Sequence, residues 1–122
     1  MLKGLHKNEI GSAAVIFAIC ITVFVGISAT VIDAGLIYVT KQKLVNAGDS
    51  AALAGAQELP YNTEEAENKA IQYAKSNGMK ETEISVEIDD DNRTIKVSME
   101  RNVELFFAKF LGHDRSNIKS TS

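Results

Sequence analysis

Few side chains in this sequence have the types and spacing that catalysis or metal binding requires. The two histidines, His6 and His113, are far apart, and neither lies near a cluster of Cys, Asp or Glu at ligand spacing. The acidic run that begins at Asp89 suggests calcium, but Arg93 occupies the third alternate ligand position of the EF-hand pattern and no glycine follows. A solvated turn is favoured, and no metal or cofactor is expected.

The sequence lacks the patterns typical of enzymes. It contains no nucleophile at base spacing, no carboxylate pair in an apolar setting and no phosphate-binding glycine loop. A net charge of -3 with scattered basic residues gives no support for nucleic-acid binding. The one cysteine, Cys20, cannot form a disulfide framework, and the bulky Ile19 before it argues against lipidation. We therefore expect a protein that acts by binding, with Cys20 as a small apolar filler.

The stretch of residues 11–59 dominates the sequence. No charge lies between Glu9 and Asp33, helix-forming and small residues follow, and the only proline is Pro60. We expect one long helix with a transmembrane part at residues 11–32, about 33 Å long against a hydrocarbon core of about 30 Å. Residues 33–59 would continue it as an amphipathic stalk, residues 1–10 would be a short leader, and residues 60–122 a small head.

A cleaved signal peptide is the competing interpretation of the apolar run. Gly26 and Ser28 could form a small-x-small cleavage box, but the run continues to Ile32 and exceeds the usual apolar region of about 7–15 residues. An uncleaved anchor is therefore favoured. Lys3 and Lys7 favour a cytoplasmic N-terminus and an extracytoplasmic head, although basic residues also follow the run.

Small residues recur at every fourth position of the apolar run, which would let another helix approach closely in lipid. This row consists of Ala14, Ala18, Thr22, Gly26, Thr30 and Ala34. A step of four residues falls about 40° beyond a full turn, so the row suits a right-handed crossing. Because small residues make up much of the run, a chance pattern stays open beside a helix-packing face.

Past the apolar run, the pattern predicts a membrane edge and then a packed stalk. Asp33 can reach headgroup water, so we interpret it as an edge marker, with Tyr38 as an interfacial aromatic. A stripe of small and apolar residues follows, suited to close packing against the head or against neighbouring subunits. Its members are Ile37, Leu44, Ala47, Ala51 and Ala54. Gly48 and Gly55 indicate tight contact, since each costs about 1 kcal/mol of helix propensity.

For the head we predict an α+β fold: a helix, an antiparallel hairpin, a short Phe-rich helix and a third strand. Asn62 is the expected N-cap of the helix and Gly78 its stop. Residues 82–88 and 94–99 alternate as a hairpin with one face on the core. Residues 103–111 read as a helix covering the sheet, with an exposed aromatic surface as the alternative. Residues 118–122 begin a third strand, as in a fragment of a longer protein.

Residues 8–58 resemble the N-terminal region of the TadE/TadG-like proteins, accessory proteins of the Flp (tight-adherence) pilus. The resemblance rests on the run GSAAVIFA from Gly11, then Asp33, Tyr38 and Gln-x-Leu, then NAGDSAALAGA. Gly48 stands where the family more often has alanine. The matching positions are Gly11, Asp33, Tyr38, Gln42, Leu44, Asn46, Ala47, Asp49, Ala51, Ala52, Leu53, Ala54, Gly55 and Ala56.

The resemblance implies a pilin-like fold and a single-pass, minor-pilin-like component of a bacterial pilus or secretion machine, and no enzyme. Its expected partners are the membrane and other subunits of that machine, with a homo-oligomer as an open alternative. Some members are thought to be processed by a prepilin peptidase, and Gly4 with Glu9 reproduces the spacing of such a site. Polar residues at His6, Lys7 and Asn8 argue against that processing. A generic anchored module that binds a ligand or the cell wall is the alternative function.

Overall fold

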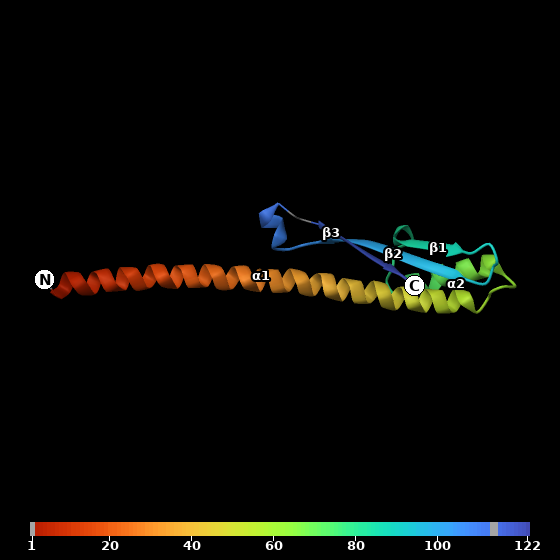
Figure 1. Cartoon of the computed structure of the whole chain (residues 1–122), viewed down its shortest axis with the longest axis horizontal. Coiled ribbons are helices and arrows are strands. Elements are labelled where there is room, and N and C mark those ends of the chain that lie inside the picture. Colours follow the sequence, from red (N-terminus) through yellow and green to blue (C-terminus); the bar gives the residue numbers. More distant parts are fainter. Residues whose placement is uncertain (1, 113–114) are drawn as a thin grey trace.

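One continuous helix carries the whole molecule. The computed structural model describes residues 2–112 and 115–122, so the expectation about His113 lies outside the described residues. Helix α1 (Leu2–Ala56) is 55 residues long and unbroken; its N-terminal half projects alone, and the head lies along its C-terminal half (Figure 1). The expected uninterrupted helix is confirmed, although it ends at Ala56 and not at Leu59. A turn with a cis Leu59–Pro60 peptide follows.

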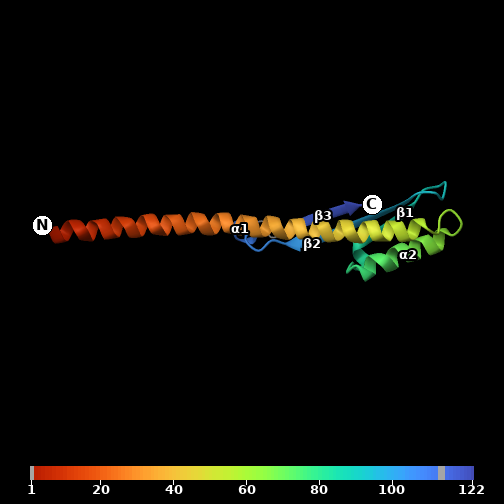
Figure 2. The ribbon, with the colours of Figure 1, turned by 90° about the horizontal axis from the view of Figure 1, so that it is seen from below.

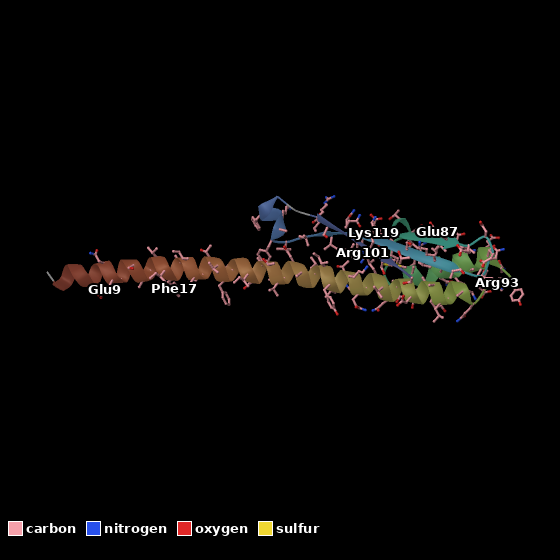
Figure 3. All side chains as sticks on the ribbon, in the orientation of Figure 1. Glu9, Phe17, Glu87, Arg93, Arg101 and Lys119 are labelled. Carbon is pink, nitrogen blue, oxygen red and sulfur yellow. The ribbon has the colours of Figure 1, made fainter. Side chains whose placement is uncertain are left out.

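The projecting half of α1 has the composition of a membrane span. Its most apolar 18-residue window has a mean hydropathy of 2.7, and only 6% of that window is buried. Large apolar side chains such as Phe17, 67% exposed, therefore have no cover from the head (Figure 3). The hydroxyls of Thr22, Ser28 and Thr30 each donate to the carbonyl four residues earlier in the helix. Such bonds satisfy the hydroxyl groups where no water is available.

Helix α2 (Thr63–Ser76) folds back along α1 (Figure 2). The predicted caps are confirmed: Asn62 Oδ1 accepts from the Glu65 backbone N–H at 3.0 Å, and Gly78 follows the helix with a φ of 87°. Ala66, Ala70 and Ala74 form its buried face. These small side chains let the two helices lie close together.

Three antiparallel strands complete the head, in the order β1-β2-β3. They are β1 (Ile84–Ile88), β2 (Ile95–Glu104) and β3 (Arg115–Thr121), with a short 3-10 turn, η1 (Glu81–Glu83), before β1. The predicted hairpin is confirmed, since Val86 pairs with Val97 and Ile84 with Met99. The predicted third strand is also present and starts three residues earlier than expected. The acidic turn at residues 89–94 is exposed, as predicted.

The core lies between α1, α2 and one face of the sheet. Leu44, Val97 and Met99 are its largest fully buried side chains, and Ala47 and Ala51 of α1 are completely covered. The predicted stripe of small residues on α1 therefore faces the head. Gly55 brings α2 close, because a Cβ there would lie 2.8 Å from the Ala66 carbonyl oxygen and 2.5 Å from Ile95 Cδ1.

An ion pair ties β2 to the connection between α2 and β1. The Arg101 guanidinium donates to Glu83 Oε2 at 2.9 Å and to the Gly78 carbonyl at 3.0 Å. The hydrogen bond from Arg101 lowers the pKa of the Glu83 carboxyl, while its burial acts in the opposite direction. Because both side chains are mostly covered, the contact is worth more than an exposed ion pair.

The expected helix at residues 103–111 is wrong over its first half. Val103 and Glu104 belong to β2, where they pair with Ser116 and Arg115 of β3. Only η2 (Ala108–Leu111) is helical, as a four-residue 3-10 turn that Gly112 closes with a φ of 85°. Val103 and Leu105 are both buried with an exposed residue between them, which is the alternation typical of an extended segment. In the sequence these residues run directly into the phenylalanines that follow, so the pattern predicts one helix for the whole apolar segment. Nor does η2 cover the sheet; it lies beside α1, on the side of the projecting half (Figure 1).

Candidate functional site

Asp33 is the centre of the candidate site, at the junction between the projecting half of α1 and the head. Its side chain is only 8% exposed. Oδ1 accepts from the Phe106 backbone N–H at 2.9 Å, and Oδ2 accepts from the Ala108 N–H at 2.8 Å. The Phe107 N–H lies 3.3 and 3.2 Å from the two oxygens. The carboxylate thus binds three successive backbone donors.

Two of these donors, the N–H groups of Phe107 and Ala108, belong to the N-cap and first residue of the helical turn η2, and Phe106 directly precedes them. The first N–H groups of any helix have no acceptor within the helix, and a cluster of them forms a concave binding site for an oxygen anion. Here the anion is a side chain of α1, more than 70 residues earlier in the sequence. The expected role of Asp33 as a solvated edge marker is therefore wrong: it is a buried acceptor that fixes the head to the helix.

The segment that Asp33 binds is called the Phe loop here, residues 106–112. Phe106 and Phe107 are in edge contact, with ring centroids 6.1 Å apart at 55°. Phe107 is half-buried, whereas Phe106 is 75% and Phe110 86% exposed. The expected aromatic lid over the sheet is therefore wrong, and the alternative of an exposed aromatic surface fits.

A groove of about 550 Å³ runs between the Phe loop and α1. Phe107, Ala108 and Phe110 form one wall. The α1 wall comes from Thr22, Val25, Gly26, Ala29, Thr30, Asp33, Ala34 and Ile37. Asp33 is the one charged residue of this lining, so the groove is an apolar site suited to apolar atoms.

The small-residue row meets this groove over most of its length. Thr22, Gly26, Thr30 and Ala34 line it, whereas Ala14 and Ala18 lie further toward the N-terminus and are exposed. A Cβ added to Gly26 would meet nothing within 4 Å. The row therefore borders the Phe loop, and its packing against a second membrane helix stays a prediction.

The remaining motif positions divide between two faces of α1. Leu44, Ala47, Ala51, Ala54 and Gly55 are buried in the head, with Ala52 beside them. The exposed set is Tyr38, Gln42, Asn46, Asp49, Leu53 and Ala56. At 100° per residue these six positions fall within about 80° of one another. Tyr38 is 70% and Leu53 67% exposed, so this face of α1 has large apolar side chains that the head does not cover.

The other sequence-predicted sites also lie on α1. Gly4 and Glu9 lie in the first turns of α1, and Gly11 follows on the exposed helix. Gly48 is buried, and a Cβ there would lie 2.9 Å from Ser122 Oγ, which itself donates to Asp49 at 2.6 Å. Among the described residues no group of His, Cys, Asp and Glu could hold a metal ion.

Sequence reasoning missed the partners of Asp33. Its isolation was the available signal, since Asp33 is the only charged residue between Glu9 and Lys41. A single carboxylate at the end of an apolar run destabilises the protein in an apolar environment unless hydrogen-bond donors bind it. The partners of Asp33 could not be identified from the sequence, because they are backbone N–H groups and not side chains of a particular type.

The described residues contain one helix that is long and apolar enough to cross a membrane, and this helix continues into a small α+β head, the organisation of a single-pass membrane protein. Residues 11–58 match the family of putative Flp pilus-assembly TadE/G-like proteins, which confirms the resemblance over that segment. The match covers most of α1, from its apolar run to its buried C-terminal half, and stops just before Pro60. Neither the curated proteins nor the solved structures give a match to the chain.

Proposed function

We propose that the protein is a minor-pilin-like accessory component of a Flp/Tad pilus assembly or secretion machine, and that it acts through helix packing and protein contacts. Its organisation would be a leader at residues 1–10, a span at 11–32, a stalk at 33–59 and a head at 60–122. The N-terminus would be cytoplasmic and the head extracytoplasmic. The role is structural, in keeping with a pilus-assembly family.

The observation that supports this proposal is that the family-motif residues lie on two different faces of α1. One face of the matched segment builds the core of the head, which explains its small residues. The other face lies outside the core, where Asp49 accepts a hydrogen bond from Ser122 Oγ, and it contains Tyr38 and Leu53, both more than two-thirds exposed. Exposed apolar groups within a family motif are suited to contacts with other subunits.

Co-purification with pilus-machine components tests the proposal. The wild type is expected to co-purify with them, and Gly26→Leu is expected to lose this partner set because the small-residue row becomes too bulky for helix approach. The matched control is Ala13→Leu, which adds bulk to the same apolar run about 180° away from Thr22. Equal recovery from both variants would contradict packing through the row, and no recovery by the wild type would contradict the function.

Orientation is tested by labelling cysteines from outside the cell. Cys20 is the only cysteine, so a Cys20→Ser background gives a clean start. Tyr61→Cys places a thiol at a residue that is 95% exposed, in the turn between α1 and α2. That turn lies at the end of the molecule opposite the N-terminus (Figure 1). A membrane-impermeant maleimide is expected to label it in intact spheroplasts. Labelling only after lysis would reverse the assigned orientation.

The same experiments separate the alternative, an anchored module that binds a ligand or the cell wall. Such a module would sediment with isolated cell wall and would show no dependence on Gly26. In the described head, no observation favours this function over the first one.

A further inference from the structure

The Phe loop lies beside a part of α1 that is closer to the N-terminus than the rest of the head. Asp33 binds the start of the loop, and Phe107, Ala108 and Phe110 share a groove with α1 residues as far back as Thr22. Thr22 precedes Asp33 by 11 residues, or about 16 Å of helix. Figures 1 and 2 both show the loop beside the orange part of α1, displaced from the head toward the N-terminus. The loop therefore lies beside the apolar run itself.

The length of that run decides where the membrane surface falls. The uncharged stretch from Ile10 to Ile32 is long enough to cross a hydrocarbon core of about 30 Å. If the loop stayed in water, the membrane span would have to end near Thr22. Only Ile10 to Ile21, about 18 Å of helix, would then remain to cross the hydrocarbon core. Val25, Val31 and Ile32, each at least 55% exposed, would then also stand in water. A full span requires the loop to enter the bilayer.

The loop has the properties that lipid demands. Its exposed side chains include Phe106 and Phe110, the most exposed aromatics near the span. Five of its backbone N–H groups have partners: Asp33 accepts from residues 106–108, and the Phe110 and Gly112 N–H groups bond to the carbonyls of Phe107 and Lys109. Irregular backbone is not tolerated in the hydrocarbon core when it is exposed to lipid, so insertion requires both these partners and the cover that α1 gives to Phe107 and Ala108. Lys109, also exposed, can extend its ammonium group toward the headgroups.

We propose that the Phe loop is inserted in the bilayer, with Phe106 and Phe110 among the acyl chains of the leaflet on the head's side and Asp33 holding the loop against α1. Lipid is the favoured occupant because the exposed rings continue the apolar surface that α1 presents on all sides from Ile10 to Ile32. The head would thereby lie against the membrane at a fixed height. This inference rests on the membrane span of the proposed function.

Tryptophan quenching tests the insertion, since the chain contains no tryptophan. Three single variants of the full chain are reconstituted in phosphatidylcholine vesicles with and without dibrominated acyl chains. Phe110→Trp reports on the loop, Phe17→Trp on the span, and Tyr61→Trp on the far end of the head. Each position is more than 60% exposed, so the substitutions leave the core unchanged. Aqueous acrylamide is the complementary quencher.

We expect brominated lipid to quench tryptophan at positions 110 and 17, with a blue-shifted emission, and acrylamide to quench only position 61. Quenching of position 110 by acrylamide, with position 17 still quenched by lipid, would overturn the loop insertion and leave the span intact. Loss of lipid quenching at position 17 as well would overturn the span. Protection of position 110 from both quenchers would overturn the lipid assignment, because a second copy or another protein would then cover the loop.

Discussion

At the scale of single residues, Asp33 has the most consequential contacts. A carboxylate with two oxygens can satisfy several N–H donors at once, and charge-assisted hydrogen bonds of this kind are stronger than neutral ones. Asp33 uses this capacity on the Phe106, Phe107 and Ala108 amides. The side chain thus replaces the water that the loop would otherwise need.

Asp33→Asn is expected to release the Phe loop. An amide has one acceptor oxygen, and its NH₂ group would face backbone donors, leaving at least one N–H unpaired at a cost of about 1–3 kcal/mol. Hydrogen exchange of the amides at residues 106–108 in nanodiscs should therefore become about 10- to 100-fold faster. Asp49→Asn is the matched control, because Asp49 is exposed and bonds only a serine hydroxyl in the described contacts. Unchanged protection in the Asp33 variant would show that the carboxylate does not hold the loop.

The Glu83–Arg101 pair should give the head a specific acid sensitivity. Arg101 lowers the pKa of the Glu83 carboxyl in the folded state, so the charged form contributes stability at neutral pH. That contribution is lost as the pH falls from the ordinary glutamate pKa through the lower folded value. The urea midpoint of Glu83→Gln in detergent should therefore lie below that of the wild type at neutral pH and converge with it in acid.

Glu104→Gln serves as the control for that series. Glu104 Oε1 lies 3.8 Å from Arg115, and both side chains are more than 60% exposed, so this pair should contribute little. If the Glu104 and Glu83 variants follow the same pH curve, the partly buried pair has no special role.

At the scale of elements, the approach of α2 to α1 depends on Gly55. An added Cβ would lie 2.8 Å from the Ala66 carbonyl and 3.3 Å from Ala70 Cβ, both on α2. Gly55→Ala should therefore displace α2 and lower the free energy of unfolding by about 1–3 kcal/mol, despite the better helix propensity of alanine. Gly35→Ala, with nothing within 4 Å, should instead be neutral or stabilising by up to about 1 kcal/mol. Urea unfolding in detergent compares them, and equal midpoints would contradict the tight contact.

The elements also show what the sequence could predict. Hydrophobic periodicity and capping residues were sufficient to predict α1, α2 and the hairpin, because each of these elements is specified by residues close together in the sequence. The Asn62 side chain accepts from the Glu65 N–H three residues later, and Ile84, Val86 and Ile88 alternate along one strand. The family motif likewise located the stalk, since its buried positions follow the helical repeat.

Non-local contacts explain the failures. Val103 and Glu104 are extended because β3 pairs with β2 there, and a window of apolar residues cannot reveal a partner strand that follows a turn. The same limit hid the role of Asp33, whose partners are backbone groups 73 to 75 residues away. Both errors fall at the junction of span and head, where local and long-range preferences compete.

At the scale of the whole molecule, α1 does two separate tasks along one helix. Its buried core residues begin at Leu44, with Ile37 partly buried beside them, whereas residues 10–32 are exposed apart from Ser28 and Ala29. The span therefore adds almost no core to the head. Because no turn or loop separates the two parts, any tilt of the span is transmitted to the head.

This division predicts that the head folds without its span. A fragment of residues 33–122 keeps Asp33, the stalk and the whole core cluster, so it should show helical and sheet circular dichroism and one cooperative thermal transition. Exposure of Phe106 and Phe110 should make it self-associate, and Phe106→Ser with Phe110→Ser should restore a monomer in sedimentation. Leu44→Ala in the same fragment removes a fully buried side chain at a cost of about 2–5 kcal/mol and should unfold it or nearly so. A fragment that is unfolded before any such change would mean that the span is part of the folding unit, and the boundary at residue 33 would be wrong.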